Sequence, residues 1–166
     1  MTIQINYKKS NLKKPLNNVV FFVDEKFNIS NLKKYISNSD FSYTNDLLKT
    51  SDLKKNLIVF NISSKKMIIL VSVKGDLESS DMENLGAEFY GLINNEKKSE
   101  YFVNSDSISN IYEKFIGYFL HGLKLKSYEF NIYKSKNDKK LINISVIGKK
   151  NKLTIKNELR FKAIEE

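Results

Sequence analysis

Few residues of this chain could do chemistry, and its single histidine, His121, is the first to consider. Protein zinc sites combine several histidine, cysteine or carboxylate ligands, but the sequence has no cysteine and no second histidine. It also contains neither an H-E-x-x-H zinc helix nor a G-x-S-x-G nucleophile turn. We therefore predict no catalytic residue and no metal site in this segment. His121 is interpreted as a structural residue, partly exposed or hydrogen-bonded, late in a helix from Ser107 to Leu123.

Four carboxylates, Asp76, Glu78, Asp81 and Glu83, are spaced closely enough to suggest a site for a hard cation. A second interpretation needs no ligand. Asp81 and Glu83 lie in the first turn of a predicted helix, where negative charge interacts favourably with the helix dipole, and the other two precede it in a loop. We prefer this second interpretation and expect a capping box at Ser80-x-x-Glu83.

The six glycines form neither a G-x-G-x-x-G fingerprint nor a P-loop, so the sequence does not indicate a phosphate cradle or a bound cofactor. Gly86 and Gly91 lie within one predicted helix, and Gly117 and Gly122 lie within another. We expect these glycines to allow close packing of helix against sheet.

The formal net charge is +9, which raises the possibility of a nucleic-acid partner. Arg160 is the only arginine, however, and base and phosphate recognition favours the planar guanidinium over the lysine ammonium. We expect a solvated lysine surface, with only weak nucleic-acid binding. Tyr128, Phe130 and Tyr133 lie near lysines and could form a stacking platform, but we prefer an extended segment whose Tyr128 and Phe130 are buried on one face.

The elements that must position these residues alternate between strands and helices. Helix-spaced apolar residues predict helices at Asp81 to Asn94 and Ser107 to Leu123, with shorter ones at Ser30 to Ile36 and Tyr43 to Leu48. Apolar runs and alternation predict strands at Ile3 to Tyr7, Asn18 to Val23, Asn56 to Ile62, Lys66 to Val73, Tyr101 to Val103 and Leu141 to Ile147. This pattern predicts an α/β fold in which helices cover a mixed β-sheet.

The N-terminal segment lacks the apolar stretch of a signal peptide, and no apolar run approaches the roughly 20 residues that span a bilayer. We expect a cytoplasmic protein with no membrane contact.

One segment resembles a known family. Phe115 to Lys136 reads FIGYFLHGLKLKSYEFNIYKSK, and it is similar to a helix followed by Tyr-x-Phe-[Asp/Asn]-x-Tyr-Lys-Ser in the N-terminal domain of leucyl (cytosol) aminopeptidases, the M17 metallopeptidase family. Asn84-Leu85-Gly86-Ala87 resembles the Leu-Gly pair of an earlier helix in that domain. The motif positions are Tyr128, Phe130, Asn131, Tyr133, Lys134 and Ser135, with Asn131 in place of the more usual aspartate.

The resemblance implies a macro-domain-like three-layer fold over residues 1–150. Residues 151–166 would begin the helix that connects to a C-terminal catalytic domain of the same chain. In the family, that catalytic domain holds two divalent metal ions, Zn or Mn, and removes N-terminal amino acids from peptides, and the enzymes form hexamers. No catalytic residue of the family can be transferred to a position of this chain, so the segment would serve oligomer assembly and access to the active sites.

Two other functions stay open. The first is a stand-alone macro-like module that binds a nucleotide, ADP-ribose or nucleic acid. The absence of a glycine-rich loop weighs against the nucleotide form and the scarcity of arginine against the nucleic-acid form. The second is an enzyme in its own right, which the lack of a nucleophile, base and metal cluster disfavours.

Overall fold

The computed structural model describes residues 2–8, 16–107, 114–133 and 141–149, together with Lys156 and Leu159. For Thr2 and for residues 129–133 only the backbone is described. The expected connecting helix over residues 151–166 therefore lies almost wholly outside the described residues.

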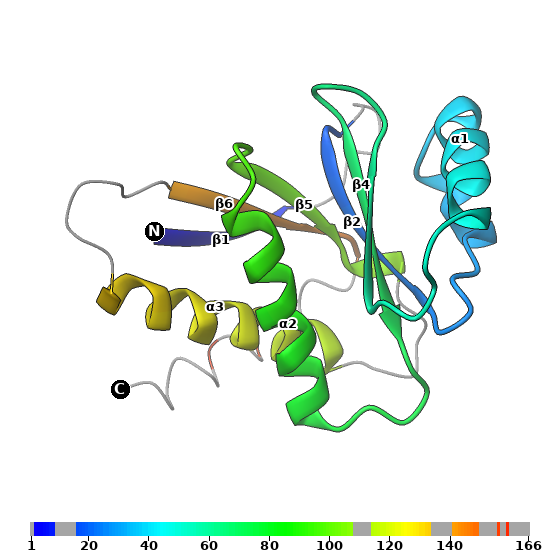
Figure 1. Cartoon of the computed structure of the whole chain (residues 1–166). Helices are drawn as coiled ribbons and strands as arrows, with labels where there is room; N and C mark the ends of the chain where they lie inside the picture. The colour runs from blue at the N-terminus through cyan, green and yellow to red at the C-terminus, as the bar shows by residue number, and fades with distance from the viewer. Residues whose placement is uncertain are drawn as a thin grey trace.

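All six predicted strands are present, and they form one sheet (Figure 1). The order across the sheet is β1-β6-β5-β2-β4-β3, and every neighbouring pair is parallel except β3 with β4. The strands are β1 Thr2–Lys8, β2 Asn18–Asp24, β3 Leu57–Asn61, β4 Met67–Val73, β5 Glu100–Asn104 and β6 Leu141–Ile147.

Helices cover the two faces of the sheet, which confirms a three-layer α/β arrangement (Figure 1). On one face lie η1 (Ser30–Lys34) and α1 (Asn38–Lys49), and on the other lie α2 (Ser79–Asn94) and α3 (Phe115–Tyr133). Every residue of β4 is buried, because a central strand covered on both sides has no solvent face. The two apolar clusters, one on each face, form the core.

Helix α3 differs from its prediction. It runs to Tyr133, ten residues beyond Leu123, and the segment with Tyr128 that we predicted to be extended is helical. Leu123 and Ser127 are both buried, so the four-residue spacing of the buried face continues past Leu123 and keeps the helical period. The predicted helix begins at Ser107, but Ser105–Ser107 form a short 3-10 turn, η2, and residues 108–113 lie outside the described residues.

Helix α2 confirms the prediction for Asp81 to Asn94 but begins earlier, at Ser79. The predicted capping box at Ser80 and Glu83 is wrong, because the N-cap residue is Glu78. The Glu78 N–H donates to the Asp81 carboxylate over 3.1 Å, so two carboxylates perform the role that we assigned to a serine and a glutamate.

Helices α2 and α3 touch through two glycines. A Cβ atom on Gly86 would overlap the backbone carbonyl of Phe119, and one on Gly122 would overlap the backbone of Glu83. The expectation of close packing was right, but the close surface is helix on helix and not helix on sheet. Gly91 has no such neighbour within 4 Å.

None of the helices in the described part of the chain is long and apolar enough to cross a membrane.

Candidate functional site

The place where a fold of this topology offers a ligand crevice is the carboxyl edge of the sheet between β2 and β5. The connection from β2 runs over one face of the sheet to β3, whereas the connection from β5 runs over the other face to β6. Such a switch point opens a gap beyond the strand ends. The pairing of β2 with β5 covers only Val19 with Phe102 and Val20 with Val103, so the two strands part before they end. This gap is the candidate site.

The chain fills this gap itself. The Phe22 N–H, which has no partner strand beside it here, donates to the Ser107 hydroxyl oxygen over 2.9 Å. The same hydroxyl donates to the Asn104 carbonyl over 2.7 Å. Turn η2 thus supplies the hydrogen bonds that a ligand would otherwise make to the end of β2.

The end of β6 is closed in the same manner. The Asp106 carboxylate accepts the Lys149 N–H, with distances of 2.9 and 3.0 Å to its two oxygens, and the buried Ser105 hydroxyl donates to the Ile147 carbonyl over 2.9 Å. Gly148 has φ of +140°, and a Cβ there would lie 2.9 Å from the Asp106 carboxylate. Only glycine fits this backbone at this distance.

At the end of β2, the Asp24 carboxylate accepts the N–H groups of Lys26 (3.1 Å) and Asn28 (2.9 Å), while Phe27 adopts a positive φ of 54°. The amide donors described here, near the ends of β2 and β6, are therefore bonded to side chains of the same chain. Two of those acceptors, Asp24 and Asp106, are carboxylates, which disfavour a phosphate by repulsion and by competition for the same donors.

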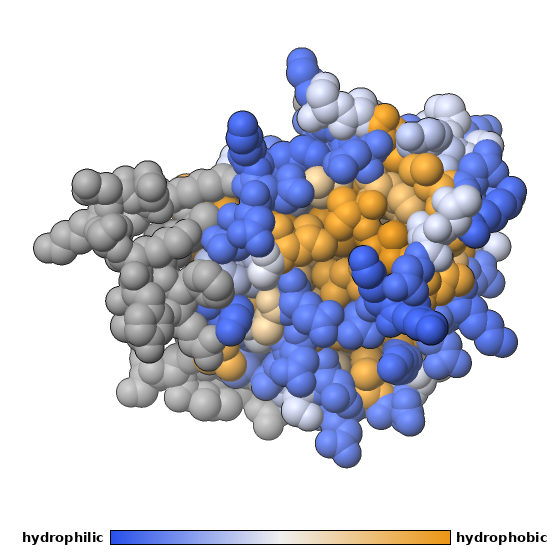
Figure 2. All heavy atoms as spheres, in the orientation of Figure 1, coloured by the Kyte–Doolittle hydropathy of each residue, from blue (hydrophilic) through white to orange (hydrophobic). Residues whose placement is uncertain are grey.

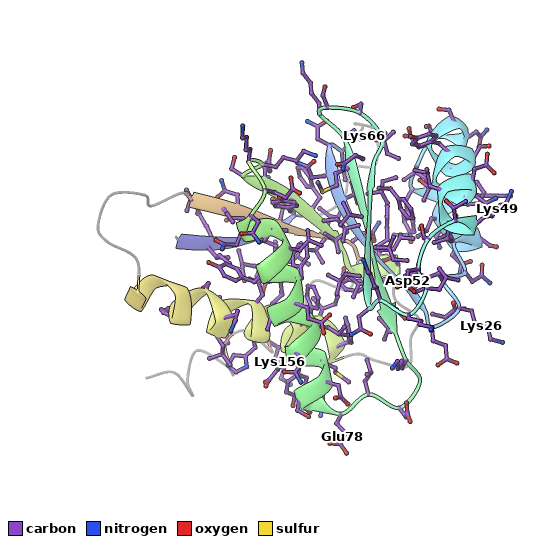
Figure 3. All side chains as sticks on the ribbon, viewed as in Figure 1. Lys26, Lys49, Asp52, Lys66, Glu78 and Lys156 are labelled. Carbon is purple, nitrogen blue, oxygen red and sulfur yellow. The ribbon has the colours of Figure 1, made fainter. Side chains whose placement is uncertain are left out.

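The predicted acidic cluster is divided by the structure. Asp81 caps α2, whereas Glu83 points to α3, where its Oε1 lies 2.9 Å from the Nδ1 of His121. Figure 3 places Glu78 at the outer end of α2. The interpretation of His121 as a hydrogen-bonded helix residue is confirmed. Among the described residues, no three His, Cys, Asp or Glu side chains are grouped so that they could hold a metal ion.

A polar cleft of about 330 Å³ lies between α2 and the neighbouring ends of β3 and β4. The amide of Asn56 donates across it to the Glu88 carboxylate, with distances of 3.1 and 3.3 Å. This bond ties the start of β3 to α2. The cleft is lined by Asn56, Ser72, Lys74, Asp76, Leu77, Asp81, Asn84, Leu85 and Glu88.

The residues of the family motif are not brought together into a pocket in the described part of the chain. Tyr128 lies on α3 with 60% of its surface exposed, so the prediction of its burial is wrong. Its helical backbone removes the strand alternation on which that prediction rested. The side chains of Phe130, Asn131 and Tyr133 are not among those described, and Lys134 and Ser135 lie outside the described residues.

The residues at the strand ends, Asn104 to Ser107 and Gly148, were missed by the sequence analysis. The signal was present in the polar run Asn104-Ser105-Asp106-Ser107 directly after an apolar strand, since such residues form hydrogen-bonded turns.

No family model matches the sequence, and no curated protein matches it. The fold is similar to that of a tomato leucine aminopeptidase variant, with a TM-score of 0.65 and 15% identity over 98% of this chain. This chain spans 37% of the aminopeptidase chain.

Two macrodomains are also similar in structure. For a macrodomain variant from Oceanobacillus iheyensis the TM-score is 0.59, with 13% identity over 99% of this chain and 94% of that one. For the macrodomain of Thermus aquaticus DarG it is 0.55, with 9% identity over 88% and 99%. These likenesses confirm the expected macro-domain-like three-layer fold.

Proposed function

We propose that this chain is the non-catalytic N-terminal domain of an M17-type leucyl aminopeptidase, which assists assembly of the hexamer and shapes access to the active sites. The main supporting observation is the self-filled switch-point gap, where Ser107 occupies the Phe22 N–H and Asp106 occupies the Lys149 N–H. A domain that is retained for its shape can use these donors internally, whereas a nucleotide-binding domain needs them for phosphate.

The likeness to leucine aminopeptidase over nearly this whole chain gives further support, as does the Tyr-x-Phe-Asn-x-Tyr-Lys-Ser motif that begins at Tyr128. Under this proposal the parent enzyme is cytoplasmic, and its two divalent ions, Zn or Mn, belong to the C-terminal catalytic domain. The described part of this chain provides no ligand cluster that would fit them.

Immunoprecipitation from the source cells, with an antibody raised against this domain, tests the proposal. We expect a polypeptide much longer than 166 residues that hydrolyses leucine p-nitroanilide after addition of Mn²⁺ or Zn²⁺. The recombinant 166-residue chain is the matched control and should be inactive with the same metals. Recovery of only a short, inactive polypeptide would contradict the proposal.

The likeness to two macrodomains supports a second candidate, a stand-alone module that binds a nucleotide or ADP-ribose. Thermal unfolding with ADP-ribose, and with adenosine as the phosphate-free control, separates the two candidates. A ligand that binds only the folded state at about 100 times its Kd adds about 2.7 kcal/mol of stability, which a melting curve detects readily. We expect no shift, because the amides at the carboxyl edge are already bonded.

A further inference from the structure

Strand β3 lies at one edge of the sheet, and among the described residues it has a partner strand on one side only. The carbonyl of Asn56 accepts the Ser72 N–H over 2.8 Å, and the Ile62 N–H donates to the Lys66 carbonyl over 2.9 Å. In an antiparallel pair every second residue is bonded to the partner strand, so residues 56, 58, 60 and 62 face β4. The N–H and C=O groups of Leu57, Val59 and Asn61 consequently point away from the sheet.

These outward groups have no hydrogen-bond partner within the described residues, in contrast to the amides at the carboxyl edge. Proteins usually protect such an edge with a charged residue, a proline or a bulge inside the strand. The strand reads Leu-Ile-Val-Phe-Asn, and its pairing with β4 runs without interruption from Leu57 to Asn61. Within the part of the chain that the structure describes, this edge is therefore open to another strand.

The side chains of β3 favour an apolar neighbour. Ile58 and Phe60 are buried against the α1 face, while Leu57 and Val59 are only partly buried and pack against the core on the α2 face. Figure 2 shows apolar surface on this face of the molecule, beside α2 and over the strands of the β3–β4 hairpin. A strand added along β3 would cover this surface with every second side chain.

Positive charge lies at both ends of the strand. Lys54 and Lys55 precede β3 and Lys65 follows it; all three are exposed and form no ion pair in the described part of the chain. Figure 3 shows the two ends well apart, with Asp52 before β3 and Lys66 after it. Asp52, whose carboxylate accepts the Lys54 N–H, keeps its negative charge and offsets one of the two lysines before β3, whereas Lys66 is paired with Asp40. Each end of the strand therefore keeps net positive charge.

This charge distribution selects among partners. A second copy paired antiparallel along β3 would place Lys54 and Lys55 of one chain near Lys65 of the other, and like charges oppose that arrangement. A strand with carboxylates at both ends would meet opposite charge at each end. We propose that the outer edge of β3 binds an extended segment of a partner protein, with apolar alternate residues and acidic ends, as a seventh strand of the sheet.

A fluorescent peptide of alternating Val and Thr, with two Asp at each end, tests the proposal by fluorescence anisotropy with the full chain. We expect saturable binding, which a peptide with Lys in place of Asp loses by about tenfold or more. Val59→Pro removes an outward N–H without removing a bond to β4, and it should abolish binding while the circular dichroism spectrum is retained. Val59→Thr keeps the N–H and is the matched control, which should bind normally.

A second measurement does not depend on the folding of a variant. The same peptide, N-methylated at alternate residues on the edge that would face β3, should not bind the unaltered chain, because it cannot donate to the outward carbonyls. Equal binding of the methylated peptide, equal binding of the Lys peptide, or a dimer in analytical ultracentrifugation that Val59→Pro dissociates would each overturn the proposal. These outcomes do not depend on whether the parent protein is an aminopeptidase.

Discussion

The carboxyl edge of the sheet near η2 and the side edge at β3 differ in whether their outward backbone groups are hydrogen-bonded within the chain. At the carboxyl edge, the N–H groups of Phe22, Lys149 and Asn28 are each bonded to a side chain of the chain. At β3, the outward groups of Leu57 and Val59 have no partner in the described part of the protein. An unpaired backbone group must bond to water or to another molecule.

We expect a partner to bind this domain at the β3 edge and not at the carboxyl edge of the sheet. The gap between β2 and β5 is the usual ligand position for such a sheet, but here it is filled with polar side chains that hold the strand ends together. The β3 edge, by contrast, exposes backbone donors and acceptors that have no partner among the described residues. We therefore expect substitutions at the carboxyl edge to affect stability, and those at the outward positions of β3 to affect binding.

Among substitutions at the carboxyl edge, the largest expected effect is at Gly148. Gly148→Ala forces a side chain into a φ of +140° and against the side chains of Ser105 and Asp106, so we expect a loss of about 3 kcal/mol in the free energy of unfolding, from backbone strain together with overpacking. Urea unfolding followed by circular dichroism measures it. Gly75→Ala is the control, since no atom lies within 4 Å of its added Cβ, and it should change stability by less than about 0.5 kcal/mol.

Ser107→Ala should cost about 2 kcal/mol, because it leaves the Phe22 N–H without its side-chain acceptor. The exposed Ser64→Ala is the control and should be nearly silent. A different outcome would be unchanged stability together with new binding of inorganic phosphate by Ser107→Ala. It would show that the gap between β2 and β5 is a ligand site, in which a ligand can replace the serine hydroxyl as the acceptor of the Phe22 N–H.

Asp40 ties α1 to the β3–β4 turn through its ion pair with Lys66. Burial raises the pKa of Asp40, but the hydrogen bonds from Lys66 and Ser37 and the Lys66 charge outweigh it and lower the pKa below its usual value of 3.8. A lowered carboxyl pKa stabilises the fold at pH values above the unfolded pKa, and this contribution is lost as the pH falls through the folded pKa.

Asp40→Asn should therefore cost about 1 kcal/mol at pH 7 and progressively less as the pH falls below about 4. Urea titrations at several pH values, compared between the two proteins, measure the difference. Asp46→Asn is the control, because its pair with Lys49 is two-thirds exposed on both sides and contributes little. A difference that stays constant down to pH 2 would show that the carboxylate charge of Asp40 is not responsible.

The sequence predicted the regular elements better than the ends that join them. All six strands and the helix from Asp81 to Asn94 could be predicted from the spacing of apolar residues along the sequence. This spacing is a local property, because it reflects which side of a strand or helix is buried. The bonds from Phe22 to Ser107 and from Lys149 to Asp106 join residues 85 and 43 positions apart. No local pattern determines which strand ends meet, so the filled gap could not be predicted.

Two errors have a shared physical cause. Ser80 was chosen as the cap of α2 and Tyr128 was placed on a strand because short motifs were interpreted without the tertiary contacts that select between alternatives. The structure begins α2 at Ser79, where Glu78 and Asp81 form the capping box, and continues α3 through Tyr128, with Ser127 buried on the continued helical face.

A much smaller effect is expected at Tyr128. This substitution tests whether the outer surface of α3 is exposed, as the β3 edge is, or is covered, as the carboxyl edge is. Tyr128 is 60% exposed, whereas Leu123, five residues earlier, is fully buried. Tyr128→Ala removes little buried area, so we expect a change within about 0.5 kcal/mol, while Leu123→Ala should cost about 2 to 5 kcal/mol. Thermal melts of the two variants measure both effects. A loss of several kcal/mol at Tyr128 would mean that another part of the protein covers this ring, and the surface of α3 would then have to be counted with the filled regions.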